Sequence, residues 1–195
     1  MRLLKLIRYY FMPGKTKTSE IKIRNAKKTD MLAIQAIYAY SVLKGLASFE
    51  EIPPDHKEML KRRKALLDKG YPYRVAEVEG VVKGFAYAGP FRQRSAYLYT
   101  VENSIYISID SQGLGIGQQL LEDLIECCNE RGYRQMISII GDSKNYSSIA
   151  LHTGLGFEKI GVQPSVGFKF GRWVDSVIMQ RALGEGDTTP PVSIE

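Results

Sequence analysis

Short segments in which apolar and polar residues alternate recur along the chain, and this alternation is typical of half-buried β-strands. Between them, apolar residues recur every three or four positions, as on one face of an amphipathic helix. The order predicts a strand, two helices, three antiparallel strands, a helix, a strand, a helix and two closing strands. The predicted strands are 21–25, 73–79, 81–88, 97–109, 135–141, 157–161 and 167–179, and the predicted helices are 30–44, 55–69, 118–131 and 145–155.

Two interruptions of this pattern lead to specific expectations. Gly89-Pro90 should end the strand that begins at Val81. Glu102-Asn103-Ser104 is a polar triplet inside a strand otherwise rich in Tyr, Ile and Val. Such a triplet predicts either a β-bulge or a functional surface.

A cluster of glycines joins the long strand to the helix that follows it. Gly113, Gly115 and Gly117 stand at alternate positions where that helix begins, so their backbone N–H groups are bare of side chains. The helix dipole adds partial positive charge at this end, and together these groups can hold a phosphate. A flexible strand–helix loop is the alternative for the glycines taken alone.

Composition and charge bound the class of protein. The 195 residues, 44% hydrophobic and 25% charged, fit a single ordinary globular domain. No run of 18 apolar residues is present, so we expect no stable membrane association. Most of the formal net charge of +6 lies at the N-terminus, which leaves a near-neutral body and predicts no nucleic-acid binding. We expect a basic N-terminal extension over residues 1–20, one domain over 21–183 and a polar C-terminal tail over 184–195.

Cys127 and Cys128 are the only cysteines, and as sequence neighbours they cannot join distant segments. Nothing near them completes a zinc ligand set, so no metal site is expected. Unpaired cysteines fit a reducing compartment, and we expect a cytoplasmic protein.

Motifs around the glycines resemble those of the GNAT acetyltransferases. Gln112, Gly115 and Gly117 match the family pattern Gln/Arg-x-x-Gly-x-Gly/Ala, and Asn145 with the later run 155–157 resembles a second family segment. The likeness covers roughly residues 21–182. It implies an α/β (α+β) fold with a mixed, mostly antiparallel central sheet of about seven strands flanked by about four helices.

Further segments look like the phosphinothricin and methionine-sulfone N-acetyltransferase branch of that family. They are 86–97, 100–102 and 170–175. The resemblance implies acetyl-CoA as the donor, the α-amine of a small amino acid or analogue as the acceptor, and a homodimer. Leu121 departs from the pattern, because some phosphinothricin enzymes have a tyrosine there. We therefore expect the acceptor pocket to lack that polar group.

The resemblance places the acetyl-CoA site on three segments. The backbone of Ile105, Tyr106 and Ile107 would pair with the pantetheine arm, and an N–H there could stabilise the oxyanion formed from the thioester. Asn145 would bond the CoA arm, although a plain helix N-cap is the alternative. The pyrophosphate loop comprises Gln112, Gly113, Leu114, Gly115, Ile116 and Gly117.

Two residues are candidates for moving protons. Glu102 is a carboxylate in a strand interior, where unpaired charge is costly, and we predict that it acts as general base or holds the substrate ammonium. His152 follows Asn145 in the helix, where many GNAT members carry a tyrosine that protonates the leaving thiolate. A histidine could do the same near neutral pH. A histidine packed on the sheet is the alternative.

The acceptor site is expected on the loop before the catalytic strand and on the strand itself. Arg92 and Arg94 could grip a carboxylate or phosphinate in a bidentate fork, and solvated loop arginines are the alternative. The other substrate-binding candidates are Phe49, Gln93, Tyr97, Glu102, Asn103 and Ser104.

Other functions stay open from sequence. A GNAT enzyme could acetylate a protein N-terminus or a polyamine, although Arg92 and Arg94 would repel a polyamine. A non-catalytic module could bind CoA, although the presence of Glu102 argues against it. A dinucleotide-binding turn could use the glycines with Asp142 as its ribose acid, but it needs a third glycine where Leu120 stands.

Overall fold

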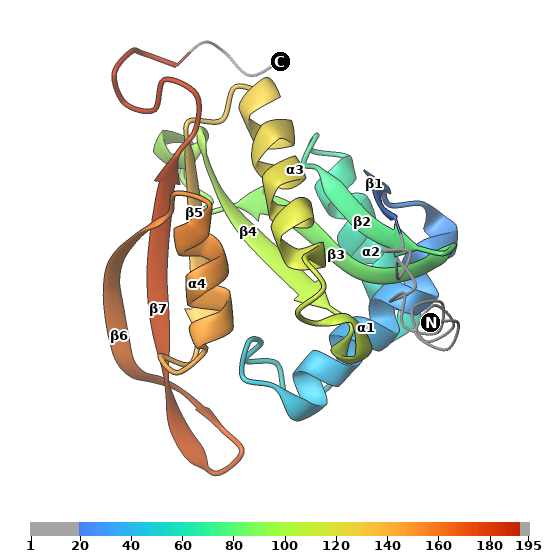
Figure 1. Cartoon of the computed structure of the whole chain (residues 1–195). Coiled ribbons are helices and arrows are strands. Elements are labelled where there is room, and N and C mark those ends of the chain that lie inside the picture. Colours follow the sequence, from blue (N-terminus) through green and yellow to red (C-terminus); the bar gives the residue numbers. More distant parts are fainter. Residues whose placement is uncertain (1–19, 192–195) are drawn as a thin grey trace, which may run out of the picture.

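A computed structural model describes residues 20–191, which form one mixed sheet with helices on both faces (Figure 1). The sheet order is β1-β2-β3-β4-β5-β7-β6, and all neighbours pair antiparallel except β4 and β5. This is the mostly antiparallel architecture that the sequence predicts. The strands are β1 (Ile21–Asn25), β2 (Tyr73–Val78), β3 (Val81–Pro90), β4 (Thr100–Ile107), β5 (Gln135–Gly141), β6 (Glu158–Lys169) and β7 (Arg172–Ala182).

Each face of the sheet has its own hydrophobic core. α3 and α4 pack on one face, and α1 and α2 pack on the other (Figure 1). The leucine stripe of α3, which includes Leu120, Leu121 and Leu124, is fully buried, as its spacing predicts. Leu121 lies in this core and lines neither of the cavities described below, so its effect on the acceptor pocket stays a prediction. The helices are α1 (Met31–Lys44), α2 (His56–Leu67), α3 (Ile116–Glu130) and α4 (Tyr146–Gly154).

β3 and β4 differ from the sequence prediction at their ends. The strand predicted from Tyr97 begins at Thr100, because residues 95–97 form a 3-10 turn. β3 does not end before Gly89: it continues to Pro90, which pairs with Val101. The predicted bulge is absent, since β4 pairs with β3 in one register through the whole polar triplet. Of the two predictions for the polar triplet, a bulge or a functional surface, only the functional surface remains.

The closing hairpin also differs from prediction. Residues 162–166, expected to separate two strands, lie inside β6, which shifts its register against β7 between Lys159 and Gly161 and again between Gln163 and Gly167. The chain reverses instead at Phe170 and Gly171, whose φ values of 51° and 72° are those of a tight turn.

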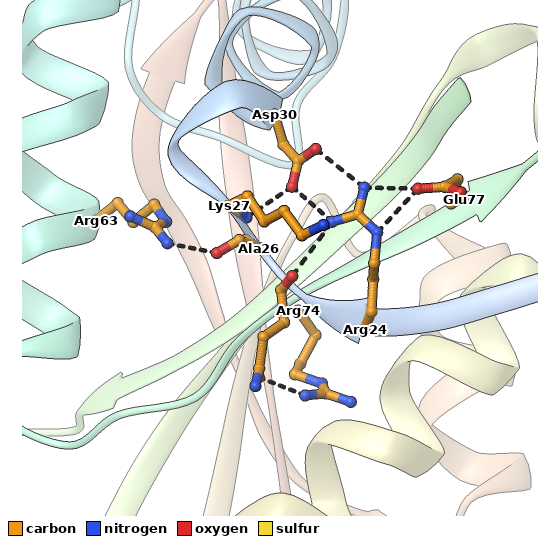
Figure 2. Close-up of polar contacts among 8 residues, drawn as sticks. Arg24, Ala26, Lys27, Asp30, Arg63, Arg74 and Glu77 are labelled. Carbon is orange, nitrogen blue, oxygen red and sulfur yellow. Dashed lines mark hydrogen bonds and ion pairs between the residues drawn. The ribbon is translucent and has the colours of Figure 1, made fainter. Parts of the chain in front are cut away.

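Arg24 ties β1 to the start of α1 and to β2. Its guanidinium donates to both carboxylate oxygens of Asp30, at 2.7 and 3.0 Å, and its Nε donates to Glu77 at 2.8 Å (Figure 2). Asp30 precedes α1, as predicted, but its carboxylate makes no cap bond to the helix and is held by Arg24 instead. This ion pair lowers the pKa of Asp30.

The two predicted terminal segments, residues 1–20 and 184–195, are described by the structure to different extents. The basic extension lies outside the described residues apart from Glu20. The described part of the C-terminal tail folds back on the domain, because the Arg134 guanidinium donates to the carbonyls of Thr189 at 2.9 Å and Pro190 at 3.1 Å. Among residues 20–191, no helix is long and apolar enough to cross a membrane.

Candidate active site

The site forms where β4 and β5 separate. The two strands pair in parallel from Thr100 opposite Gln135 to Asn103 opposite Ser138, and no further. Beyond that point β4 stays paired with β3, and β5 stays paired with β7. The edge of β4 over residues 104–107 therefore faces β5 without a strand partner, and its backbone N–H and C=O groups are available to a ligand.

Two adjoining cavities occupy this opening. The inner cavity, of about 270 Å³, is lined by the polar triplet of β4, by residues 138–141 of β5 and by His152. The loop cavity, of about 390 Å³, extends from the open edge of β4 to the glycine loop. The two cavities share the lining residues Ala47, Ile105, Tyr106, Asn145 and Ser148.

Alternation along β4 sends neighbouring side chains to opposite faces of the sheet. Tyr106 stacks on Phe85 in the α1–α2 core, so Glu102, four residues before it, points to the same face. Asn103 contacts His152 of α4 and therefore points to the α3–α4 face. The two candidates for proton transfer thus approach the opening from opposite faces, and reactants could meet between them.

Glu102 is a partly buried carboxylate at the inner cavity. Among residues 20–191 it has neither a hydrogen bond nor an ion pair, and burial alone raises its pKa. A carboxylate with a raised pKa is a better proton acceptor near neutral pH, as a general base must be.

His152 is 1% exposed, and both ring nitrogens have partners. Its Nδ1 lies 2.8 Å from the Ser148 carbonyl oxygen, which can only accept, so Nδ1 bears a proton. Its Nε2 lies 3.0 Å from Ser138 Oγ and 3.2 Å from Asn103 Oδ1. In the neutral ring Nε2 accepts from the Ser138 hydroxyl, and in the cation it can donate to Ser138 Oγ or to Asn103 Oδ1. Burial lowers the pKa of His152, so the neutral form predominates at neutral pH.

The glycine loop has the backbone conformation that an anion site uses. Gly113 and Gly115 have φ values of 76° and 80°, a region that side chains rarely adopt. Gly115 directly precedes α3, whose first N–H groups have no partner within the helix. Leu114 is 63% exposed and Ile116 is buried in the core, and neither residue lines the loop cavity. The loop cavity is lined here by Gln112, Gly113, Gly115 and Gly117.

Asn145 is the N-cap of α4. Its Oδ1 accepts the backbone N–H of Ser148 at 3.3 Å, which confirms the capping interpretation. Because Asn145 also lines both cavities, its contact with the CoA arm stays a prediction.

The predicted acceptor residues divide into two groups. Arg92, Gln93, Arg94 and Tyr97 lie in the segment between β3 and β4 and line neither cavity. The Arg92 guanidinium lies 5.1 Å from the ring centre of Phe91 and 5.6 Å from that of Tyr97. The arginine clamp therefore stays a prediction. The candidates that line the inner cavity are Phe49, Glu102, Asn103 and Ser104.

Four serines that the sequence did not bring forward line the inner cavity: Ser48, Ser138, Ser148 and Ser176. Ser138 had a signal, since it is a polar residue inside the otherwise apolar strand β5. Ser148 and Ser176 lie in ordinary helical and strand patterns and had none. Within residues 20–191, no group of three or more His, Cys, Asp or Glu side chains is placed to hold a metal ion.

Residues 23–178 match the family model of the acetyltransferase (GNAT) domain. The chain belongs to the GNAT acetyltransferase family. It is 52% identical over 169 residues to the phosphinothricin N-acetyltransferase of Alcaligenes faecalis, which covers 87% of this chain and 86% of the relative. It is 40% identical over 163 residues to the L-methionine sulfoximine/L-methionine sulfone acetyltransferase of Salmonella typhimurium, covering 84% and 95%. A crystal structure of a GNAT phosphinothricin acetyltransferase from Sinorhizobium meliloti in complex with AcCoA superposes with a TM-score of 0.86, at 48% identity, covering 89% and 94%.

Membership of this GNAT family decides between interpretations of the glycine loop. The resemblance and the predicted fold are confirmed, and the dinucleotide-binding alternative is wrong. Asp142, the ribose acid of that alternative, is instead paired with Arg172.

Proposed function

We propose that this GNAT enzyme transfers the acetyl group of acetyl-CoA to the α-amine of a small amino acid or analogue. The observation that carries the proposal is the pair of adjoining cavities, one ending at the glycine loop and the other holding Glu102. The similarity to acetyltransferases of phosphinothricin, methionine sulfoximine and methionine sulfone supports an acceptor with a free α-amine, a carboxylate and a polar side chain.

The donor is proposed to lie along the loop cavity. Its pyrophosphate accepts hydrogen bonds from residues 113–117 and the first turn of α3, where the helix dipole favours an anion. Its pantetheine arm pairs with the open edge of β4 at residues 105–107, in place of the missing strand partner. A backbone N–H of the same edge stabilises the oxyanion that forms on the thioester oxygen.

Glu102 is proposed to take the proton that the substrate ammonium must lose. At pH 7 a peptide α-amine with a pKa near 7.7–8.0 costs about 1 kcal/mol to deprotonate and a lysine amine near 10.4 costs about 4–5 kcal/mol, and the amine of a free amino acid lies between these values. The neutral amine then attacks the thioester carbon directly. The tetrahedral intermediate expels the CoA thiolate, and the enzyme itself is never acylated.

His152 is proposed to supply the proton that the thiolate takes up, through the hydroxyl of Ser138. The hydroxyl gives its proton to the sulfur and receives the Nε2 proton of the imidazolium. Burial makes the imidazolium rarer but also a stronger acid. Ser138 lines the inner cavity, whereas the ring of His152 is almost fully enclosed.

We also propose that the protein is a homodimer in the cytoplasm. Both cysteines are free, which is consistent with a reducing compartment. Light scattering coupled to size exclusion would show the dimer as twice the mass of the 22.0 kDa chain, and elution at the mass of one chain would contradict it.

The proposed function is tested in two steps, first by ligand binding and then by turnover. Acetyl-CoA should raise the melting temperature and NAD should not. Release of free CoA should then be fastest with methionine sulfone, methionine sulfoximine or phosphinothricin, and slow with a polyamine or an N-terminal peptide. Stabilisation by acetyl-CoA without turnover on any amino acid would leave the fold correct and refute the proposed acceptor class.

A further inference from the structure

The segment Gly45–Phe49, here called the strap, follows α1 and reaches the far half of the sheet. Its residues Ala47, Ser48 and Phe49 line the inner cavity. Phe49 is 41% exposed, so the position of its ring depends on what holds the strap.

Lys169, at the end of β6, holds the strap by its backbone. Its Nζ donates to the carbonyl oxygens of Ser48 at 2.6 Å and Gly45 at 3.0 Å. The residue is 3% exposed, and no carboxylate among residues 20–191 pairs with it directly; the charges of Glu50 and Glu51 act on it from a longer distance, and its Nζ lies 5.0 Å from the ring centre of Phe170. Burying an ammonium group without a directly paired carboxylate is costly, and an apolar side chain would be cheaper for packing alone. The arrangement therefore favours a role in placing the strap.

Two glycines let the strap lie against the strands. A Cβ on Gly141 of β5 would stand 2.0 Å from the Leu46 carbonyl oxygen, so the strap backbone passes directly over this residue. A Cβ on Gly167 of β6 would stand 2.4 Å from Cε2 of Phe49, so the phenyl ring lies against this backbone. The strap is thus fixed at Leu46 and Phe49 by contact, and at Gly45 and Ser48 by Lys169.

We propose that Lys169 is a positioning residue for acceptor specificity: by holding the two strap carbonyls it fixes Phe49 at the inner cavity and so sets which acceptors fit. The inference rests on the proposed function, because it assigns the inner cavity to the acceptor. Lys169 itself touches no reacting atom. Its effect is therefore expected in the KM for the acceptor more than in the KM for acetyl-CoA.

Lys169→Met removes the donors and keeps a long side chain. The amide hydrogen of Glu50, which donates to Ser48 Oγ of the strap at 3.2 Å, should exchange faster in this variant, whether or not any acceptor is turned over. The KM for the preferred acceptor should rise, by up to about 100-fold if the strap moves by about an ångström. Lys159→Met is the matched control, since Lys159 is an exposed lysine on the same strand. It should change neither quantity.

Gly167→Ala tests the same idea without removing Lys169. The new Cβ should displace the ring of Phe49, which is the free end of a side chain, while the strap backbone stays in place. The ratio of kcat/KM for a bulky acceptor to that for a small one should change. Gly161→Ala is the control on the same strand, because a Cβ there meets no atom within 4 Å.

The outcomes separate the inference from the function on which it rests. Faster exchange of the Glu50 amide in Lys169→Met together with altered acceptor preference in Gly167→Ala would support it. Unchanged exchange of this amide in a folded Lys169→Met protein would overturn it, as would identical acceptor preferences in Gly167→Ala and Gly161→Ala. If Lys169→Met does not fold, the two glycine variants decide. Wild-type protein that acetylates no amino acid refutes the proposed function instead, while the exchange measurement still reports on Lys169.

Discussion

Glu102 lies near the end of the part of β4 that pairs with β5. No cation among the described residues forms an ion pair with its carboxylate. Burial raises the pKa of Glu102, so the proposed base is lost as the pH falls through that raised value. Glu102→Gln should lower kcat/KM by about 100-fold near pH 6, where the amine needs a base. The loss should be smaller near pH 9, where a larger share of the amine is already neutral.

Rates measured across this pH range, beside the exposed α3 variant Glu126→Gln, provide the check. A Glu102→Gln enzyme with wild-type rates at every pH would remove Glu102 from the mechanism.

His152 has either a catalytic or a packing role, and the two predict different measurements. If His152 supplies the proton to the thiolate, His152→Gln should lower kcat by about 100-fold and leave the KM for acetyl-CoA similar. If His152 only packs against the sheet and bonds to Ser138, Asn103 and Ser148, the same replacement should lower the melting temperature and leave kcat intact. Steady-state kinetics and thermal unfolding on one sample distinguish the two.

At the scale of elements, the Arg24 ion pair joins β1, the start of α1 and β2. Arg24→Met should reduce the free energy of unfolding by about 2 kcal/mol, because it leaves the mostly buried carboxylate of Asp30 without its guanidinium. Lys64→Met is the control, since its pair with Asp68 is exposed and should contribute less than about 1 kcal/mol. Denaturant unfolding of both variants at neutral pH measures the difference.

The same ion pair has a pH signature. The folded pKa of Asp30 is below its unfolded value of about 3.9, so its contribution to stability is complete above that value. It is lost as the pH falls through the lower folded pKa. Wild-type stability should therefore fall more steeply in acid than that of Arg24→Met. Parallel acid curves would contradict this account.

At the scale of the molecule, the sheet consists of two halves, β1–β4 and β5–β7, and four parallel residue pairs join them. The proposed acetyl-CoA lies across this junction and should stabilise the whole fold. At about 100 times its Kd, it should add about 2.7 kcal/mol to the free energy of unfolding.

Gly115→Ala should abolish most of this gain, because the left-handed φ of 80° before α3 is strained for alanine. Thermal shift against acetyl-CoA concentration, with Gly161→Ala as control, measures it. An equal shift in both variants would show that the glycine loop does not hold the donor.

Elements whose causes are local could be predicted from sequence. The apolar stripe of α3 and the capping of α2 by Asp55, which accepts the Glu58 N–H at 2.7 Å, depend on residues a few positions apart. The chain reversal at Phe170 could not, because it depends on how β6 shifts its register against β7. Whether Arg92 and Arg94 line the cavity could not be predicted either, because the sequence of an exposed loop has no periodic pattern that indicates which residues lie beside it.

The sequence by itself determined the sheet-and-helix order, the glycine loop and the candidacy of Glu102, because periodicity and glycine spacing are properties of neighbouring residues. Only the tertiary structure decided where β5 leaves β4, and hence that a cavity opens beside Asn103. It also decided that His152 meets Ser138 and that Lys169 reaches the strap. These contacts join residues distant in the chain, and their positions follow from sheet pairing and packing that no local pattern encodes.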